Sequence, residues 1–168
     1  AGPSTETAEL RFDPSGTAII LAGSTPHGQG HETIYKQLVC EKLGLAPEDI
    51  RVIEGDTDKV SFGTGTGGSR TAAIGTSAVL QATDKVIEKA RKIAAHLLEA
   101  SEQDIALEDG KFTIAGTDRS IAFKAVASAA FAPEKLPAGM EPGLFELATF
   151  NATKANFPNG CHICEVEI

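Results

Sequence analysis

Two glycine-rich stretches organise the fold of this chain: Gly28-Gln29-Gly30-His31-Glu32-Thr33 (residues 28–33) and Gly63-Thr64-Gly65-Thr66-Gly67-Gly68-Ser69-Arg70-Thr71 (residues 63–71). Each runs directly into a segment with helical periodicity, and a helix start presents unpaired backbone N–H groups at the positive end of its dipole. Glycine lets the backbone approach a ligand closely and adopt a positive φ without strain. Two such loops in one small chain predict a ligand with phosphate at one end and polar groups at the other.

Apolar periodicity predicts two long helices. Between residues 30 and 43, apolar side chains such as Ile34 and Leu38 recur at i and i+4, and Gly44 follows where a C-cap favours glycine. A longer helix is predicted over residues 71–100, with one apolar stripe formed by Ala78, Ala82, Val86, Ala90, Ile93 and Leu97. Because the stripe is rich in alanine, we expect this helix to approach a sheet closely.

The remaining pattern is that of short strands. They are predicted over residues 8–12, 17–22, 50–53, 105–107, 111–114, 120–123, 144–151 and 161–168, with a short helix over 123–131. The predicted fold class is α+β in two layers, a mixed sheet with two long helices packed on it. Three prolines make residues 132–143 a loop, so the domain over residues 1–168 allows two small subdomains, about 1–131 and 132–168. The chain lacks an initial Met and ends inside a predicted strand, so we expect a fragment of a longer protein.

Composition excludes several classes of partner. The 168 residues carry a formal charge of −8 and a pI near 5.0, which argues against nucleic acid or an anionic membrane surface as the main partner. No apolar run approaches the roughly 20 residues that span a bilayer, and the first residues of this sequence do not have the pattern expected of a signal peptide. The three cysteines, Cys40, Cys161 and Cys164, cannot all pair, which favours a reducing compartment; we expect a cytoplasmic protein.

The second glycine-rich loop matches no standard nucleotide motif. A nominal GxGxxG begins at Gly63, but a polar stretch over residues 54–62 separates it from the preceding strand, which weakens a dinucleotide-binding interpretation. The loop continues with Ser69-Arg70 where a Walker A motif requires Lys-[Ser/Thr]. Two interpretations stay open. The loop is either an anion cradle built from backbone N–H groups, the hydroxyls of Ser69 and Thr71 and the guanidinium of Arg70, or a surface loop with a Ser or Thr N-cap.

The first loop places one amide side chain between two glycines. Gln29 can project there without steric interference, and its amide both donates and accepts hydrogen bonds. His27 and His31 flank it, but no third metal ligand is evident, so we interpret them as polar histidines at a helix start. The CxxC formed by Cys161 and Cys164 is interpreted as incidental, because residues three apart on a strand point to opposite faces.

Three stretches carry a resemblance to a known family: Gly-Ser-Thr-Pro-His-Gly-Gln-Gly-His-Glu-Thr (23–33), Gly-Asp-Thr-Asp (55–58) and Gly-Thr-Gly-Gly-Ser-Arg-Thr (65–71). They resemble the large, molybdenum-binding subunit of molybdenum hydroxylases, the family of xanthine dehydrogenase, aldehyde oxidase and aerobic carbon monoxide dehydrogenase. Residues 156–168 are similar to the strand that follows in that subunit. The resemblance covers almost the whole chain, and both loops look closer to the prokaryotic, carbon monoxide dehydrogenase-like branch than to the animal enzymes.

The resemblance implies roles for individual residues. Gln29, between Gly28 and Gly30, matches the glutamine whose side chain lies against the molybdenum–pterin centre. The loop that holds the pterin and its phosphate is matched by Gly67, Gly68, Ser69, Arg70 and Thr71. The implied cofactor is molybdopterin with molybdenum, in prokaryotic members usually molybdopterin cytosine dinucleotide. The pterin dithiolene holds the metal in this family, so no protein side chain is expected to ligate it.

The resemblance also implies what this chain lacks. The family's catalytic base is a glutamate in a Gly-x-Gly-Glu motif, which does not occur in these residues, so no catalytic residue is assigned and the chain alone is expected to be inactive. The implied partners are the remaining domains of the large subunit and the iron–sulfur and FAD subunits or domains. The implied reaction of the intact enzyme is oxidation of an aldehyde, an N-heterocycle or carbon monoxide. Two alternatives stay open, a noncatalytic cofactor-binding or assembly domain and an unrelated nucleotide-phosphate-binding domain.

Overall fold

The main sheet has four strands in the order β3-β2-β1-β7 in the computed structural model, which describes residues 5–154 and 157–167. These strands are β1 (Thr5–Phe12), β2 (Ala18–Ala22), β3 (Ile50–Glu54) and β7 (Phe145–Asn151). β1 lies antiparallel to both β2 and β7, whereas β2 and β3 are parallel. A parallel pair needs a crossover connection, and the segment that contains α1 (His31–Leu43) supplies it. The predicted mixed sheet is therefore confirmed.

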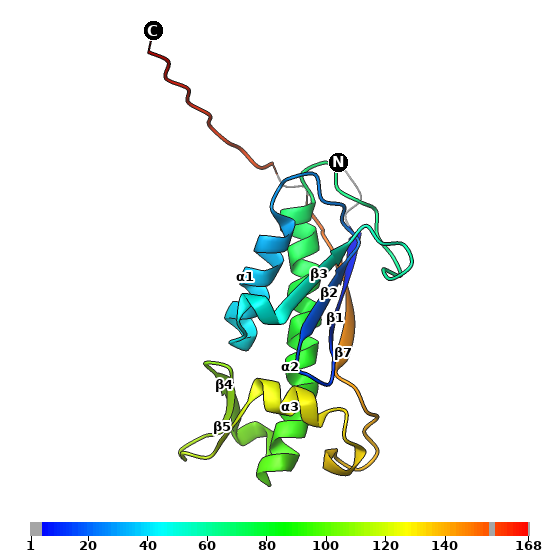
Figure 1. Ribbon diagram of the computed structural model, residues 1–168, viewed down its shortest axis with the longest axis vertical. Helices are drawn as coiled ribbons and strands as arrows, with labels where there is room; N and C mark the ends of the chain where they lie inside the picture. Colours follow the sequence, from blue (N-terminus) through cyan, green and yellow to red (C-terminus); the bar gives the residue numbers. More distant parts are fainter. Residues whose placement is uncertain (1–4, 155–156, 168) are drawn as a thin grey trace.

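Two helices cover one face of this sheet (Figure 1). α1 ends where predicted, at Gly44, whose φ of 63° is the left-handed conformation typical of a C-cap glycine. The longer helix α2 (Thr76–Leu98) is preceded by a π-helical turn, η2 (Thr71–Gly75), so helical structure begins at Thr71 as predicted. None of the helices in residues 5–154 and 157–167 combines the length and the apolarity that a membrane crossing requires. The two-layer α+β class is confirmed.

The core lies between α2 and the middle of the sheet. Alternate residues of β1, namely Ala8, Leu10 and Phe12, are buried, as the period of two along a strand requires. Most of the predicted stripe on α2 is fully buried, at 0% exposure for Ala78, Ala82, Val86, Ala90 and Ile93. Small side chains on this stripe leave room for the helix to approach the strands. The apolar periodicity of the sequence therefore identified the buried face of α2.

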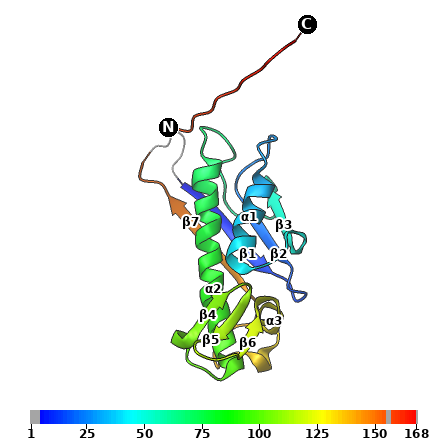
Figure 2. The ribbon, with the colours of Figure 1, turned by 90° about the vertical axis from the view of Figure 1, so that its left-hand side faces the viewer.

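A second, smaller sheet packs at the carboxyl end of α2 (Figure 2). It contains β4 (Ile105–Glu108), β5 (Lys111–Ile114) and β6 (Ser120–Ala122), and α3 (Phe123–Ala129) follows directly. The rings of Phe112 and Phe123 stack with centroids 5.7 Å apart and join this sheet to α3. Three 3₁₀ turns complete the fold, η1 (Pro47–Asp49), η3 (Glu102–Asp104) and η4 (Pro133–Lys135). The small sheet and the glycine-rich loops thus lie at opposite ends of the long helix.

The last predicted strand is wrong. Residues 161–167 form no strand, and the chain from residue 157 onward runs outward from the folded body (Figure 1); Ile168 lies outside the described residues. A strand needs a neighbour to accept its backbone hydrogen bonds, and no part of the described chain pairs with this segment. Its apolar side chains are consequently exposed, Ile163 at 91% and Val166 at 77%, and both cysteines of the CxxC are exposed too.

Candidate functional site

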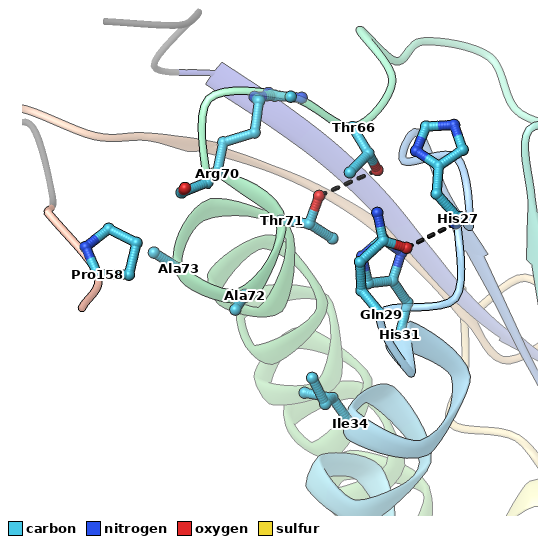
Figure 3. A pocket seen from close by; sticks show the side chains of 12 residues that line it. His27, Gln29, His31, Ile34, Thr66, Arg70, Thr71, Ala72, Ala73 and Pro158 are labelled. Atoms are coloured by element: carbon cyan, nitrogen blue, oxygen red, sulfur yellow. Dashed lines mark hydrogen bonds between the residues drawn. The ribbon is translucent and has the colours of Figure 1, made fainter. Parts of the chain in front are cut away.

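One cavity of about 720 Å³ opens between the two glycine-rich loops and the helix starts that follow them (Figure 3). It is lined by His27, Gln29, His31, Ile34, Thr66, Gly67, Ser69, Arg70, Thr71, Ala72, Ala73 and Pro158. Gln29 and His31 come from the first loop and the first turn of α1, whereas Thr66 and Thr71 come from the second loop and η2. Both loops therefore contribute to a single cavity, and its volume is typical of a small-molecule site.

The structure brings most of the residues selected from the sequence to this cavity. Its walls include Gln29, Gly67, Ser69, Arg70 and Thr71. The remaining selected residues, Gly28, Gly30 and Gly68, lie next to them in the chain and have φ values of 91°, 78° and 58°. A side chain is strained at such angles, so the loop geometry requires glycine there. A β-carbon at Gly67 would meet no protein atom within 4 Å, which shows that open space borders its backbone.

A contact between two glycines joins the loops. A β-carbon at Gly23 would collide with the Cα of Gly63, so the backbones touch at this point. The amide of Gly65 donates to the carbonyl of Gly23 at 3.0 Å, and the amide of Thr25 donates to Thr66 Oγ1 at 3.0 Å. Thr66 Oγ1 lies 3.1 Å from the hydroxyl of Thr71 (Figure 3). The two walls of the cavity are therefore held together by direct hydrogen bonds rather than by the core alone.

Arg70 is turned into the protein in this structure. Its Nη1 lies 2.6 Å from Oε2 of Glu6 and donates to the carbonyl of Gly65 at 2.8 Å, while Nη2 donates to the carbonyl of Thr5. The side chains of Arg70 and Glu6 are only 4% and 3% exposed. The contacts observed for the guanidinium therefore bind the second loop to β1, and the direct contact to a phosphate expected from the sequence stays a prediction.

A network of buried polar side chains joins the first loop and α1 to the end of β3. His31 Nδ1 lies 3.0 Å from Oε1 of Glu54, the last residue of β3, and the hydroxyl of Ser24 donates to the same oxygen. Ser24 Oγ also lies 3.0 Å from the hydroxyl of Tyr35 on α1. Burial raises the pKa of Tyr35 to about 12; the hydrogen bond with Ser24 lowers this pKa, whereas the nearby carboxylates of Glu54 and Glu6 raise it.

Sequence reasoning missed both carboxylates that organise the site. Glu6 and Glu54 lie 64 and 23 residues from Arg70 and His31, so no local spacing links the partners. His31 was interpreted as a polar histidine at a helix start, and α1 does begin at this residue. Its burial, at 5% exposure, could not be read from the local pattern.

The cavity has the chemistry of an anion site. The N-cap residues of α1 and η2, Gly30 and Arg70, make no side-chain hydrogen bond to their helices, so the Ser or Thr N-cap expected as an alternative is absent at residue 70. The first N–H groups of each helix are therefore not capped by the side chain of the N-cap residue, and they lie at the positive end of a helix dipole. Among the residues that the structure describes, no three His, Cys, Asp or Glu side chains gather into a metal-ligand set.

Comparison with known proteins matches the whole chain to one family. The model of the molybdopterin cofactor-binding domain matches residues 1–168. The chain is 40% identical over 164 residues to the carbon monoxide dehydrogenase large chain of Hydrogenophaga pseudoflava, covering 97% of this chain and 20% of that protein. It is 37% identical over 165 residues to the nicotine 6-hydroxylase large subunit of Paenarthrobacter nicotinovorans, with the same coverage of 97% and 20%.

A solved structure has the same fold. Reconstituted CO dehydrogenase from Oligotropha carboxidovorans superposes with a TM-score of 0.83 at 35% identity, over 88% of this chain and 18% of that one. The chain therefore spans about a fifth of the length of the curated relatives it matches.

The buried ion pair predicts a large loss of stability on truncation. Arg70→Ala leaves the carboxylate of Glu6 buried and unpaired, so we expect it to lower the free energy of unfolding in urea by about 3–5 kcal/mol. The matched control is Lys42→Ala, which removes an exposed pair with Asp84 and should cost less than about 1 kcal/mol. Equal losses in the two variants would contradict the anchoring role of the pair.

The position of Tyr35 predicts an unusual titration. Tyr35 is the sole tyrosine and the chain has no tryptophan, so phenolate absorbance reports this residue alone. We expect a midpoint near 12 in the native protein and near the ordinary value of about 10 in urea. The unfolded phenol loses its proton first, so Tyr35 stabilises the fold fully below about pH 10 and this contribution is lost as pH rises toward 12. Identical native and denatured midpoints would disprove its burial.

Proposed function

Because the chain belongs to the molybdopterin cofactor-binding domain family, we propose that its cavity holds a molybdopterin cofactor as part of a molybdenum hydroxylase. The observation that carries the proposal is that two helix starts, whose N-cap residues Gly30 and Arg70 make no side-chain cap, converge on one cavity of about 720 Å³. Open space beside Gly67 fits a ligand that approaches the backbone closely. The residues present therefore fit an elongated anionic cofactor.

Gln29 is proposed to contact the polar, metal-bearing end of the cofactor. Its side-chain oxygen accepts a hydrogen bond of 2.6 Å from the amide of His27, which fixes the side chain across the loop (Figure 3). The amide nitrogen of Gln29 is then the group that can donate to a ligand in the cavity. A side chain held in advance loses little entropy when the ligand binds.

The second loop is proposed to bind the pterin and its phosphate. The backbone of Gly67 and Gly68, the hydroxyls of Ser69 and Thr71 and the start of η2 supply donors to an anion. Arg70 supports this loop through its buried ion pair with Glu6. We propose the cytosine dinucleotide form of the cofactor, because both loops resemble the prokaryotic branch of the family.

When bound, the molybdenum–pterin group supplies the redox centre for substrate oxidation, and the residues of this chain bind and orient it. The substrate is proposed to be an aldehyde, an N-heterocycle or carbon monoxide; two relatives bear the names carbon monoxide dehydrogenase and nicotine 6-hydroxylase. We propose that the chain acts inside a cytoplasmic large subunit with iron–sulfur and FAD partners and has no activity alone.

The decisive experiment measures cofactor content in the intact large subunit that contains this chain. We expect molybdenum and pterin in equal amounts, with cytidine monophosphate released on hydrolysis. Gln29→Ala should weaken retention about tenfold, because it removes one placed hydrogen bond. Gln37→Ala, the same change on the exposed face of α1, is the control. Full occupancy without turnover of any substrate class would favour the noncatalytic binding domain, and tight binding of NAD or ATP instead would favour the nucleotide-phosphate domain.

Gly67 provides a test that separates cofactor binding from folding. The residue has no positive φ and a β-carbon there meets open space, so Gly67→Val should leave the unfolding midpoint unchanged. The added side chain occupies space beside the cavity, and we expect the molybdenum content of the purified subunit to fall at least tenfold. Gly116→Val is the contrasting variant. A valine at this position is strained because the φ of residue 116 is 76°, but the residue lies outside the cavity. Normal cofactor content in Gly67→Val would exclude a ligand beside this loop.

A further inference from the structure

His31 occupies a position that the proposed site does not yet explain. It is the first residue of α1, it is 5% exposed, and its ring lines the cavity beside Gln29 (Figure 3). A histidine whose only task is to begin a helix has no need of burial, because an exposed side chain serves equally well there. Burial of a polar ring is unfavourable unless each nitrogen finds a partner.

The partner of one ring nitrogen is clear. Nδ1 lies 3.0 Å from Oε1 of Glu54, and both side chains are almost fully buried, at 4% and 5% exposure. Glu54 ends β3 and pairs in register with Ala22 at the end of β2, so the sheet sets the position of its carboxylate. Ser24 donates to the same oxygen from the first loop. The carboxylate is thus held by the sheet and by the loop, and it fixes the plane of the imidazole.

The other ring nitrogen is left for the cavity. Within the described chain, the hydrogen bond of the ring is made by Nδ1. Donation of the Nδ1 proton to a carboxylate selects the tautomer and orientation of an imidazole, as in other sites where a carboxylate supports a functional histidine. Nε2 is then the ring atom available to a ligand in the cavity that His31 lines.

We infer that His31 Nε2 makes a second polar contact to the bound cofactor beside Gln29, and that Glu54 is the positioning residue that aims it. The inference rests on the proposed function. It assigns two groups, two residues apart in the chain, to the polar end of the cavity. The oxygen of Gln29 accepts a hydrogen bond from the amide of His27, and Nδ1 of His31 is paired with Glu54. Each side chain uses one polar atom for support and leaves the other for the ligand.

Two substitutions at His31 separate support from ligand contact. The amide of asparagine reaches the position of Nδ1, and the amide of glutamine reaches that of Nε2. His31→Asn therefore keeps the bond to Glu54 but loses the contact to the cofactor, and His31→Gln does the reverse. His96→Asn, an exposed histidine in the last turn of α2, is the matched control.

The readouts are molybdenum and pterin per subunit after prolonged gel filtration, and the unfolding midpoint of the same protein stripped of cofactor. We expect His31→Asn to lose cofactor about tenfold faster than wild type with little change in the midpoint. His31→Gln should retain cofactor to within about threefold of wild type while lowering the midpoint. Glu54→Gln, which keeps the acceptor oxygen, should retain more cofactor than Glu54→Ala.

The opposite order overturns the inference: retention in His31→Asn with loss in His31→Gln would make the ring purely structural. Wild-type retention in both variants would equally exclude a contact through Nε2. These outcomes differ from a failure of the proposed function, in which the wild-type subunit itself carries no molybdenum or pterin.

Discussion

The ion pair between Glu6 and Arg70 connects the core of the molecule to the loop that lines the cavity. Removing two charges from water is unfavourable unless their remaining hydrogen-bonding groups are satisfied. The guanidinium meets this condition, since it also donates to the carbonyls of Thr5 and Gly65. One side chain therefore binds a β1 carboxylate, the β1 backbone and the second loop together. The loop geometry and the start of η2 follow from this arrangement, because Arg70 is the N-cap residue of that turn.

A second buried carboxylate does the same for the opposite wall. Glu54, at the end of β3, holds Ser24 and His31, as Glu6 holds the second loop through Arg70. Both carboxylates stand on strands of the main sheet, the most regular part of the structure. The cavity walls are loops, but hydrogen bonds and ion pairs to these two carboxylates fix their positions relative to the sheet. A rigid support of this kind suits a site that must hold a large ligand in one orientation.

Local chemistry explains which features could be predicted from the sequence. The helix that ends at Gly44 and the buried stripe of α2 each depend on residues a few positions apart, and both were predicted correctly. The glycines of the cavity were identified because glycine is favoured where the backbone has a positive φ or approaches another group closely. Such positions are therefore visible in the sequence as glycine-rich stretches. The links to Glu6 and Glu54 were missed because they join distant parts of the chain. The strand over 161–168 was predicted from alternation and from the family resemblance, and neither says whether this chain contains a neighbouring strand to pair with it.

The backbone contact between Gly23 and Gly63 has a consequence for how this site can change over time. A β-carbon at residue 23 would collide with Gly63 and with the carboxylate of Glu6, and one at residue 63 would collide with Gly23. At most pairs of contacting residues, a larger side chain at one position can be compensated by a smaller side chain at the other. Gly23 and Gly63 have no side chains, so no substitution at one of them can make room for a side chain at the other. Both positions are therefore restricted to glycine, and a homologue with another residue at either one must have a different backbone conformation in both loops.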